Sequence, residues 1–113
     1  MNFIKGDVVR VNLGTLMDGV VGSEQASIRP CVILQTFHHL GLIIIIPLTT
    51  KKKHYFNSSI YPLEKGSGGL KQISYALCHQ MRTISTERII EKIGTLNIKD
   101  FNALVMVVKV TLF

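Results

Sequence analysis

Polar residues that could do chemistry gather just before an apolar run in the first third of the chain. Residues 22–30 (Gly-Ser-Glu-Gln-Ala-Ser-Ile-Arg-Pro) supply a carboxylate, an amide, two hydroxyls and a guanidinium, and the apolar residues 31–34 follow at once. A residue before proline is restricted to extended backbone, so we expect Arg29 to leave the loop already strand-like. Loops anchored on rigid strands often carry functional groups. The alternative is an ordinary surface loop in which Arg29 pairs with Glu24, and these residues alone favour neither.

A second polar group follows the most apolar run of the chain, residues 42–48. Thr49 and Thr50 come first, and residues 51–55 (Lys-Lys-Lys-His-Tyr) continue with a basic run and an aromatic ring. Such a segment can hold a phosphate backbone electrostatically while the ring stacks on a base. A run of lysines is equally typical of a solvated loop, so both interpretations stay open at this point.

A third polar group ends residues 73–82, whose alternation predicts a strand. Successive side chains of a strand point to opposite faces, so Gln80 and Arg82 are expected on one face and His79 on the other. Polar side chains at the end of a rigid strand are well preorganised for a site. Histidine is a common acid–base residue, but this alternation favours a core or interface role for His79.

The elements that position these groups are mostly short strands. Apolar patterns predict strands over residues 8–13, 31–36, 42–48, 57–63 and 73–82. The first is expected to be half-buried, with Val9 and Val11 on its inner face and Val8 on its outer face. Pro30 is expected to open the second, because the first residue of a strand can lack a ladder donor. The consecutive isoleucines of the third predict a central strand buried on both faces.

The C-terminal part of the chain predicts a turn, a strand and a helix. Residues 85–88 indicate a short helical turn, and residues 89–96 fit a strand or a short helix, of which we prefer the strand. Asn97 is a good helix N-cap with Asp100 in the first turn. An apolar stripe with the helical period follows, and it should pack on the sheet. The stripe consists of Phe101, Leu104, Val105, Val108 and Leu112.

Composition limits the classes of protein to consider. The chain has 113 residues, 47% of them hydrophobic, which is enough for one domain over residues 1–113 with one core. The net charge of +6 favours a polyanionic partner, either nucleic acid or a membrane surface. The N-terminus lacks the apolar segment of a signal peptide, and residues 42–48 are too short to span a bilayer. We therefore expect a cytoplasmic protein without a membrane segment.

Neither the cysteines nor the adjacent histidines suggest a metal site. Cys31 and Cys78 lie far apart, each within an apolar segment, which predicts reduced core thiols rather than a disulfide or a zinc site. His38 and His39 would point to opposite faces of a strand, so a solvated turn is preferred to a pair of metal ligands. No metal and no cofactor is expected.

These features form an ordered signature along the chain. It consists of Gly6-Asp7-Val8, Gly22-Ser23-Glu24-Gln25 with Arg29-Pro30, Pro47-Leu48-Thr49, Gln80-Met81-Arg82-Thr83-Ile84 and the closing amphipathic helix. The signature resembles the MazF/PemK (Kid) family of toxin endoribonucleases over essentially the whole chain. The resemblance implies an SH3-like barrel of strongly curved antiparallel strands with a C-terminal α-helix. It also implies a homodimer that cleaves single-stranded RNA, such as mRNA, sequence-specifically without a metal, and a MazE-like antitoxin whose segment occupies the RNA groove.

The resemblance also assigns roles to residues by position. Arg29 matches the family's catalytic arginine and Thr49 its catalytic threonine, and Glu24 is a candidate base. The other matching or neighbouring polar residues are expected to bind RNA. These are Ser23, Gln25, Thr50, Lys51, Lys52, Tyr55, Gln80 and Arg82.

The sequence departs from the family pattern at three of these positions or beside them. His79 stands where an acidic residue is expected, Leu77 where the Kid branch carries an arginine, and Ser23 where Kid has a histidine. A Kid-type mechanism built on an arginine and aspartate pair is therefore not expected here.

Metal-free RNA cleavage proceeds by attack of the 2′-hydroxyl on the adjacent phosphorus, giving a 2′,3′-cyclic phosphate and a 5′-hydroxyl. The 2′-oxygen must lose a proton, the non-bridging oxygens must be stabilised, and the 5′-oxygen must be protonated. Arg29 suits charge stabilisation best, because its planar fork fits a phosphate and stays charged; a proton-transfer role for it stays open. Thr49 can hold the phosphate or the 2′-hydroxyl. Glu24 is either the base or a group that orients Arg29.

Two rival functions come from other classes. A CcdB-like protein would poison DNA gyrase by binding, and an SH3-like module would bind a partner without any activity. The combined set of Arg29, Thr49, Gln80 and Arg82 argues against the gyrase poison, because such a binder needs no catalytic constellation, and only the basic charge supports the binding module.

Overall fold

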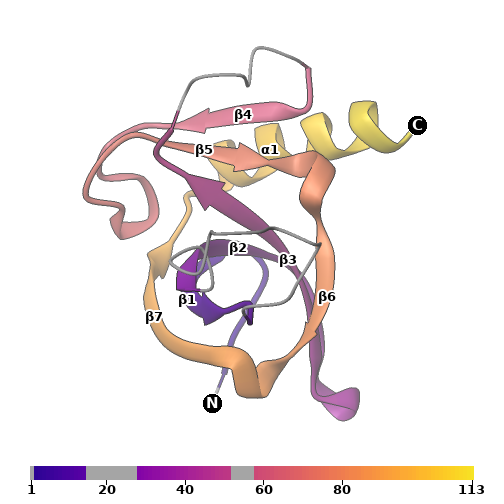
Figure 1. Cartoon of the computed structure of the whole chain (residues 1–113). Coiled ribbons are helices and arrows are strands. Elements are labelled where there is room, and N and C mark those ends of the chain that lie inside the picture. Colours follow the sequence, from indigo (N-terminus) through magenta and orange to yellow (C-terminus); the bar gives the residue numbers. More distant parts are fainter. Residues whose placement is uncertain (1, 15–27, 52–57) are drawn as a thin grey trace.

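A strongly curved antiparallel sheet carries a C-terminal helix in the computed structural model, which describes residues 2–14, 28–51 and 58–113 (Figure 1). The strands are β1 (Asp7–Asn12), β2 (Ile28–Phe37), β3 (Leu42–Thr49), β4 (Ile60–Leu63), β5 (Ser74–Leu77), β6 (Arg82–Ser85) and β7 (Ile89–Thr95). Short 3-10 turns are η3 (His38–Leu40), η4 (Ser67–Gly69), η5 (Cys78–Gln80) and η6 (Thr86–Arg88), and helix α1 spans Ile98–Leu112. This is the predicted fold class.

Strand β3 is the centre of the sheet, as its isoleucine run predicts. The strand order is β4-β5-β3-β2-β1-β7, and β6 also pairs with β3. One edge of β3 pairs with β2, and the other pairs with β6 near its start and with β5 near its end. Figure 1 shows β1, β2, β3, β6 and β7 around a ring, with β4, β5 and α1 together on one side. Among the described residues no ladder joins β6 to β7, so the sheet curves without closing.

Apolar side chains fill both faces of this sheet. The inner cluster consists of Phe3, Val9, Val11, Leu13, Cys31, Ile33, Ile43, Ile45 and Ile84. The helix-side cluster consists of Val8, Val32, Ile46, Leu48, Leu63, Leu70, Ala76, Cys78, Leu96, Leu104 and Val108. The half-buried prediction for β1 is therefore wrong at Val8, which is fully buried, because α1 and its neighbours cover the outer face.

Two predicted strand boundaries are wrong. Strand β2 begins at Ile28, so Pro30 lies inside it, opposite Arg10 of β1, rather than at its start. Residues 73–82 form two strands and a turn rather than one strand. Ala76 pairs with Leu48, and Arg82 pairs with Ile45. The chain therefore advances six residues, from 76 to 82, while β3 advances only three, from 48 to 45. The excess chain is taken up by η5.

The C-terminal predictions hold except at one position. The turn at η6, the strand β7 and the helix α1 are all present, and the Asn97 side chain accepts a hydrogen bond from the Asp100 amide at 2.7 Å. Leu104 and Val108 are buried in the predicted stripe, but Leu112 is 50% exposed because the last turn of α1 extends beyond the sheet. No helix in the described ranges is long and apolar enough to cross a membrane.

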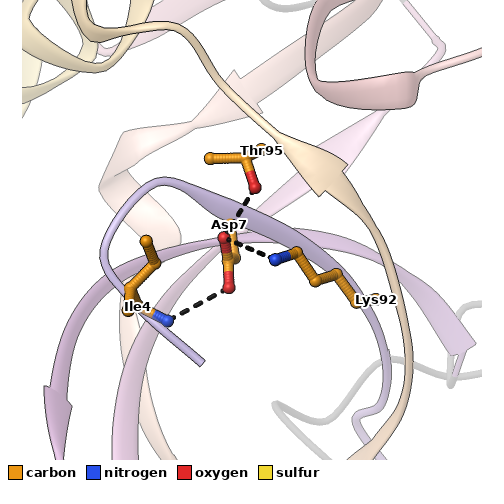
Figure 2. A network of polar contacts seen from close by, with 4 residues as sticks. All are labelled: Ile4, Asp7, Lys92 and Thr95. Atoms are coloured by element: carbon orange, nitrogen blue, oxygen red, sulfur yellow. Dashed lines mark hydrogen bonds and ion pairs between the residues drawn. The ribbon is translucent and has the colours of Figure 1, made fainter. Parts of the chain in front are cut away.

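A buried carboxylate ties the N-terminal residues and β1 to the edge strand β7 (Figure 2). Asp7 is fully buried and accepts hydrogen bonds from the Ile4 amide at 3.0 Å and from Thr95 Oγ1 at 2.8 Å. Lys92 Nζ of β7 lies 3.4 Å from the same carboxylate. A buried charge is tolerated when it is paired and hydrogen-bonded, so this network fixes β7 against β1.

Candidate functional site

Arg29 lies on the inner face of the sheet, where β2 enters it. Antiparallel register places Arg29 opposite Val11 and Cys31 opposite Val9. Val9, Val11 and Cys31 all belong to the inner cluster, and opposite residues of an antiparallel pair share a face. The half-buried Arg29 therefore borders this cluster from a strand, as the position before Pro30 predicts.

Thr49 and Arg82 lie on the same face by the same reasoning. Arg82 of β6 is opposite Ile45 of β3, an inner-cluster residue. Pro47 is opposite Cys31, and Thr49 follows Pro47 by two residues, which restores the same face of the strand. Three predicted site residues from three strands thus border one cluster.

The sheet separates between Arg29 and Thr49. The ladder between β2 and β3 ends at Cys31 and Pro47; two more residues of the same register would put Arg29 opposite Thr49. On its other edge, β3 remains paired at Thr49 with Tyr75 of β5. Pro30 and Pro47 at this end have no backbone N–H to donate, which weakens a ladder. Both side chains are therefore held by different strands around a break in the sheet.

The thiol of Cys31 lies buried on the face that Arg29 and Arg82 border. Burial raises the pKa of the Cys31 thiol to about 12, and the positive charges of Arg29 and Arg82 oppose this rise. The register places Arg29 and Arg82 on the same face of the sheet as Cys31. Planar, permanently charged guanidiniums suit a phosphate with several oxygens.

Thr49 places its hydroxyl at the turn after β3. Its Oγ1 accepts a hydrogen bond from the Lys51 amide at 3.2 Å. A threonine hydroxyl can also donate a hydrogen bond, for example to a substrate. Thr49 is half-buried, whereas Thr50 and Lys51 are exposed. The turn therefore presents one fixed hydroxyl with polar and basic groups beside it.

His79 and Gln80 lie together on η5, which corrects the sequence-based prediction for His79. Both residues are exposed, and His79 Nε2 lies 3.5 Å from Gln80 Nε2. His79 Nδ1 lies 3.0 Å from the Ser59 hydroxyl. The alternation of a strand does not apply in a 3-10 turn, so His79 is neither in the core nor on a face opposite Gln80. Nothing in the sequence singles out Ser59, because serines next to a strand are common and its contact with His79 joins residues 20 positions apart.

Several predicted site residues lie outside the described parts of the chain. They are Ser23, Glu24, Gln25, Lys52 and Tyr55. The alternative pairing of Arg29 with Glu24 and the role of the basic run therefore stay predictions.

Other expectations concern cysteines, histidines and metals. Cys31 and Cys78 are both buried free thiols, as predicted. His38 and His39 are exposed in the turn η3, as predicted. Within the described ranges, no group of three or more His, Cys, Asp and Glu side chains could hold a metal ion.

A pocket of about 300 Å³ opens at the far end of β3 from Thr49. It is lined by Phe3, His38, Gly41, Ile43, Thr86 and Glu87. None of these residues belongs to the predicted site, so the candidate site and this pocket are separate features.

Comparisons with known proteins agree on one family. The family model of the PemK-like, MazF-like toxin of type II toxin–antitoxin systems matches residues 4–112. No curated protein matches the chain. A solved structure described as an endoribonuclease in complex with its cognate antitoxin, from a mycobacterial species, has a TM-score of 0.74 and 14% identity. The match covers 98% of this chain and 95% of that one.

Two further solved structures have similar folds. The Mycobacterium tuberculosis toxin MazF-mt6 has a TM-score of 0.73 and 21% identity, with 94% of this chain and 95% of that chain covered. A structure described as an Mtb toxin has a TM-score of 0.64 and 26% identity, with 74% of this chain and 91% of that one covered. The family match therefore extends over nearly the whole chain, and the structural matches agree with it in fold.

Proposed function

Because this chain belongs to the family of PemK-like, MazF-like toxins of type II toxin–antitoxin systems, we propose that it is a sequence-specific endoribonuclease that inhibits growth. Its substrate would be single-stranded RNA, including mRNA. The observation that carries the proposal is the family match over residues 4–112, and the register of β1, β2, β3 and β6, which puts Arg29 and Arg82 on the same face of the sheet, supports it. The family match over residues 4–112 also supports a single toxin domain.

The proposed reaction is attack of the RNA 2′-hydroxyl on the neighbouring phosphorus without a metal. Arg29 and Arg82 stabilise the charge that grows on the non-bridging oxygens, which is the largest demand of this transition state. The Thr49 hydroxyl holds the phosphate or the attacking 2′-hydroxyl. The products are a 2′,3′-cyclic phosphate and a 5′-hydroxyl, and Glu24 remains the proposed base.

The experiment is cleavage of a mixed single-stranded RNA by the purified protein in EDTA, with the products sequenced. Discrete cleavage is expected from the natural protein, and Arg29→Ala should abolish it. The matched control is Arg10→Ala, because Arg10 is opposite Pro30 and so lies on the other face of the same sheet, paired with Glu91 at 2.7 Å. Retained cleavage in a folded Arg29→Ala variant would refute the assignment.

The same experiment tests the rival functions. Intact RNA together with inhibited DNA gyrase would favour the gyrase poison, and intact RNA without any enzyme inhibition would favour a binding module. The presence of Arg29, Thr49 and Arg82 on one face of the sheet argues for cleavage, since a protein that only binds its partner does not need a catalytic set of side chains.

We also propose a homodimer, an antitoxin partner and a cytoplasmic location. One solved relative is described as an endoribonuclease in complex with its cognate antitoxin. By analogy, a MazE-like segment would neutralise this protein by occupying the RNA groove. The dimer is supported by an outward row of apolar residues on α1, considered below.

A further inference from the structure

A polar cluster joins η5 to the residue before β4. His79 contacts Ser59 through Nδ1 at 3.0 Å and Gln80 through Nε2 at 3.5 Å. The backbone reinforces this link, because the Cys78 amide donates to the Ser59 carbonyl at 3.0 Å. Cys78 is itself fully buried in the helix-side cluster. The polar side chains of this cluster are therefore carried by a backbone that is held in place by this hydrogen bond and by the burial of Cys78.

The cluster lies beside the candidate site. Strands β5 and β6, on either side of η5, both pair with β3, at Leu48 and at Ile45. Three residues of a strand span about 10 Å, so η5 is confined alongside that short stretch, and β3 and η5 are in contact. The stretch contains Pro47, the partner of Cys31, on which the charges of Arg29 and Arg82 act.

The Gln80 amide contacts the His79 ring through its nitrogen, at 3.5 Å. An imidazole has two ring nitrogens, and each one in His79 has a different neighbour. With the Gln80 nitrogen donating to Nε2, the ring proton belongs on Nδ1, where it is donated to Ser59 Oγ. The amide then keeps one N–H and its carbonyl oxygen for another partner. A glutamine amide of this kind pairs with the edge of a base, and single-stranded RNA offers its base edges for such contacts.

We propose that His79, held by Ser59, is a positioning residue that orients the Gln80 amide to recognise one base beside the cleaved bond. His79 and Ser59 then determine base preference rather than the rate of the chemical step. This inference rests on the proposed ribonuclease function.

The test first compares the cleavage-site preference of the variants on a randomised single-stranded RNA. It then measures kcat and KM on the preferred RNA and on an RNA that differs from it by one base. His79→Phe keeps a ring without nitrogens, Ser59→Ala removes the hydroxyl, and Gln80→Ala removes the amide. Each should lower discrimination at the same base position by about tenfold. His79→Phe combined with Gln80→Ala should lose no more than Gln80→Ala alone, because both act through one amide. His39→Phe, an exposed residue of η3, is the control and should keep the natural preference.

The outcomes separate this inference from the function on which it rests. An unchanged preference in both His79→Phe and Ser59→Ala, with unaltered circular dichroism and thermal midpoint, overturns it. A uniform fall in kcat on all RNAs, with preference kept, also overturns it and assigns His79 to the chemistry. If His79→Phe does not fold, Ser59→Ala decides alone. Failure of the natural protein to cleave RNA overturns the proposed function and this inference together.

Discussion

Two arginines from strands β2 and β6 act on the ionisation of one buried thiol. The register of the strands places both arginines on one face of the sheet. A phosphate group has the charge and the oxygen geometry that an arginine fork can bind. Arg29 and Arg82 are therefore the residues to which we assign phosphate binding in the proposed function.

Thr49 provides a residue-scale test that leaves the shape of the site intact. Thr49→Val replaces the hydroxyl with a methyl group, and we expect kcat/KM for RNA cleavage to fall by about 10- to 100-fold, because one stabilising contact to the reacting groups is lost. Thr49→Ser keeps the hydroxyl and should stay within about threefold of the natural protein. Single-turnover cleavage measures both. Equal activity of the valine and serine variants would exclude a role for the hydroxyl.

Cys31 gives a prediction for alkaline pH. The pKa of its thiol rises from 9.0 to about 12 in the folded protein, because burial disfavours the thiolate. Above pH 9 the unfolded chain loses this proton while the folded chain keeps it, so rising pH favours unfolding. Between pH 8 and pH 10 we expect this thiol to reduce the free energy of unfolding by about 1 kcal/mol. Urea unfolding at both pH values measures the change.

The control for this prediction is Cys31→Ala. It should lower stability at both pH values by leaving a small cavity, but the fall between pH 8 and pH 10 should be smaller than in the natural protein. An identical fall in both proteins would assign the alkaline loss to other groups.

At the scale of elements, the turn η5 changes which side chains can act together. Residues 73–82 have the alternation of one strand, but β3 pairs with β5 at Leu48 and with β6 at Ile45, so the chain between them must contract. The contraction brings His79 and Gln80 to one exposed position. No local pattern encodes this, because it depends on the register of two separate ladders on a third strand.

The Asp7 network provides an element-scale test of how β7 is held (Figure 2). Asp7→Asn keeps the volume but removes the charge that pairs with Lys92 and weakens the bonds to Ile4 and Thr95. We expect the free energy of unfolding to fall by about 2–4 kcal/mol, because a buried charged hydrogen-bond partner is lost. Chemical denaturation measures the loss.

The matched control is the exposed ion pair between Arg10 and Glu91 on the same two strands, with a separation of 2.7 Å. Glu91→Gln should change stability by less than about 1 kcal/mol, because exposed pairs contribute little. Similar losses in Asp7→Asn and Glu91→Gln would contradict the assigned importance of burial.

At the scale of the whole molecule, helix α1 is apolar on two sides. One side packs on the sheet through Leu104 and Val108. The outward row, defined as Ile98, Met106, Val110 and Phe113, is 58–101% exposed. A helix that is apolar around most of its circumference is typically covered. Met106 lies near the middle of the row, so two antiparallel copies of α1 related by a twofold axis would set Met106 against Met106 and Ile98 near Phe113.

Met106→Glu tests the proposed dimer. A charge at the centre of the row would be buried twice in a twofold interface, so we expect at least a tenfold weaker dimer. Sedimentation or light scattering across a range of protein concentrations measures the change. Leu40→Glu is the control, since Leu40 is 60% exposed on η3 and lies outside α1. A monomeric natural protein, or equal effects of the two variants, would contradict this interface.

The sequence by itself predicted the central strand and the terminal helix with its Asn97 cap, and its resemblance to a known family implied the fold class. The strand and the helix follow from local causes: apolar periodicity and capping chemistry. They do not depend on which strands become neighbours.

Only the tertiary structure decided where the polar groups meet. The end of the ladder between β2 and β3, the convergence of Arg29 and Arg82 on Cys31, and the contact of His79 with Ser59 join residues that are distant in the chain. Register and curvature set these meetings, and a one-residue change in register would move every side chain of a strand to the other face. For this reason the sequence could suggest candidate site residues, while the contacts of His79 could be found only in the structure.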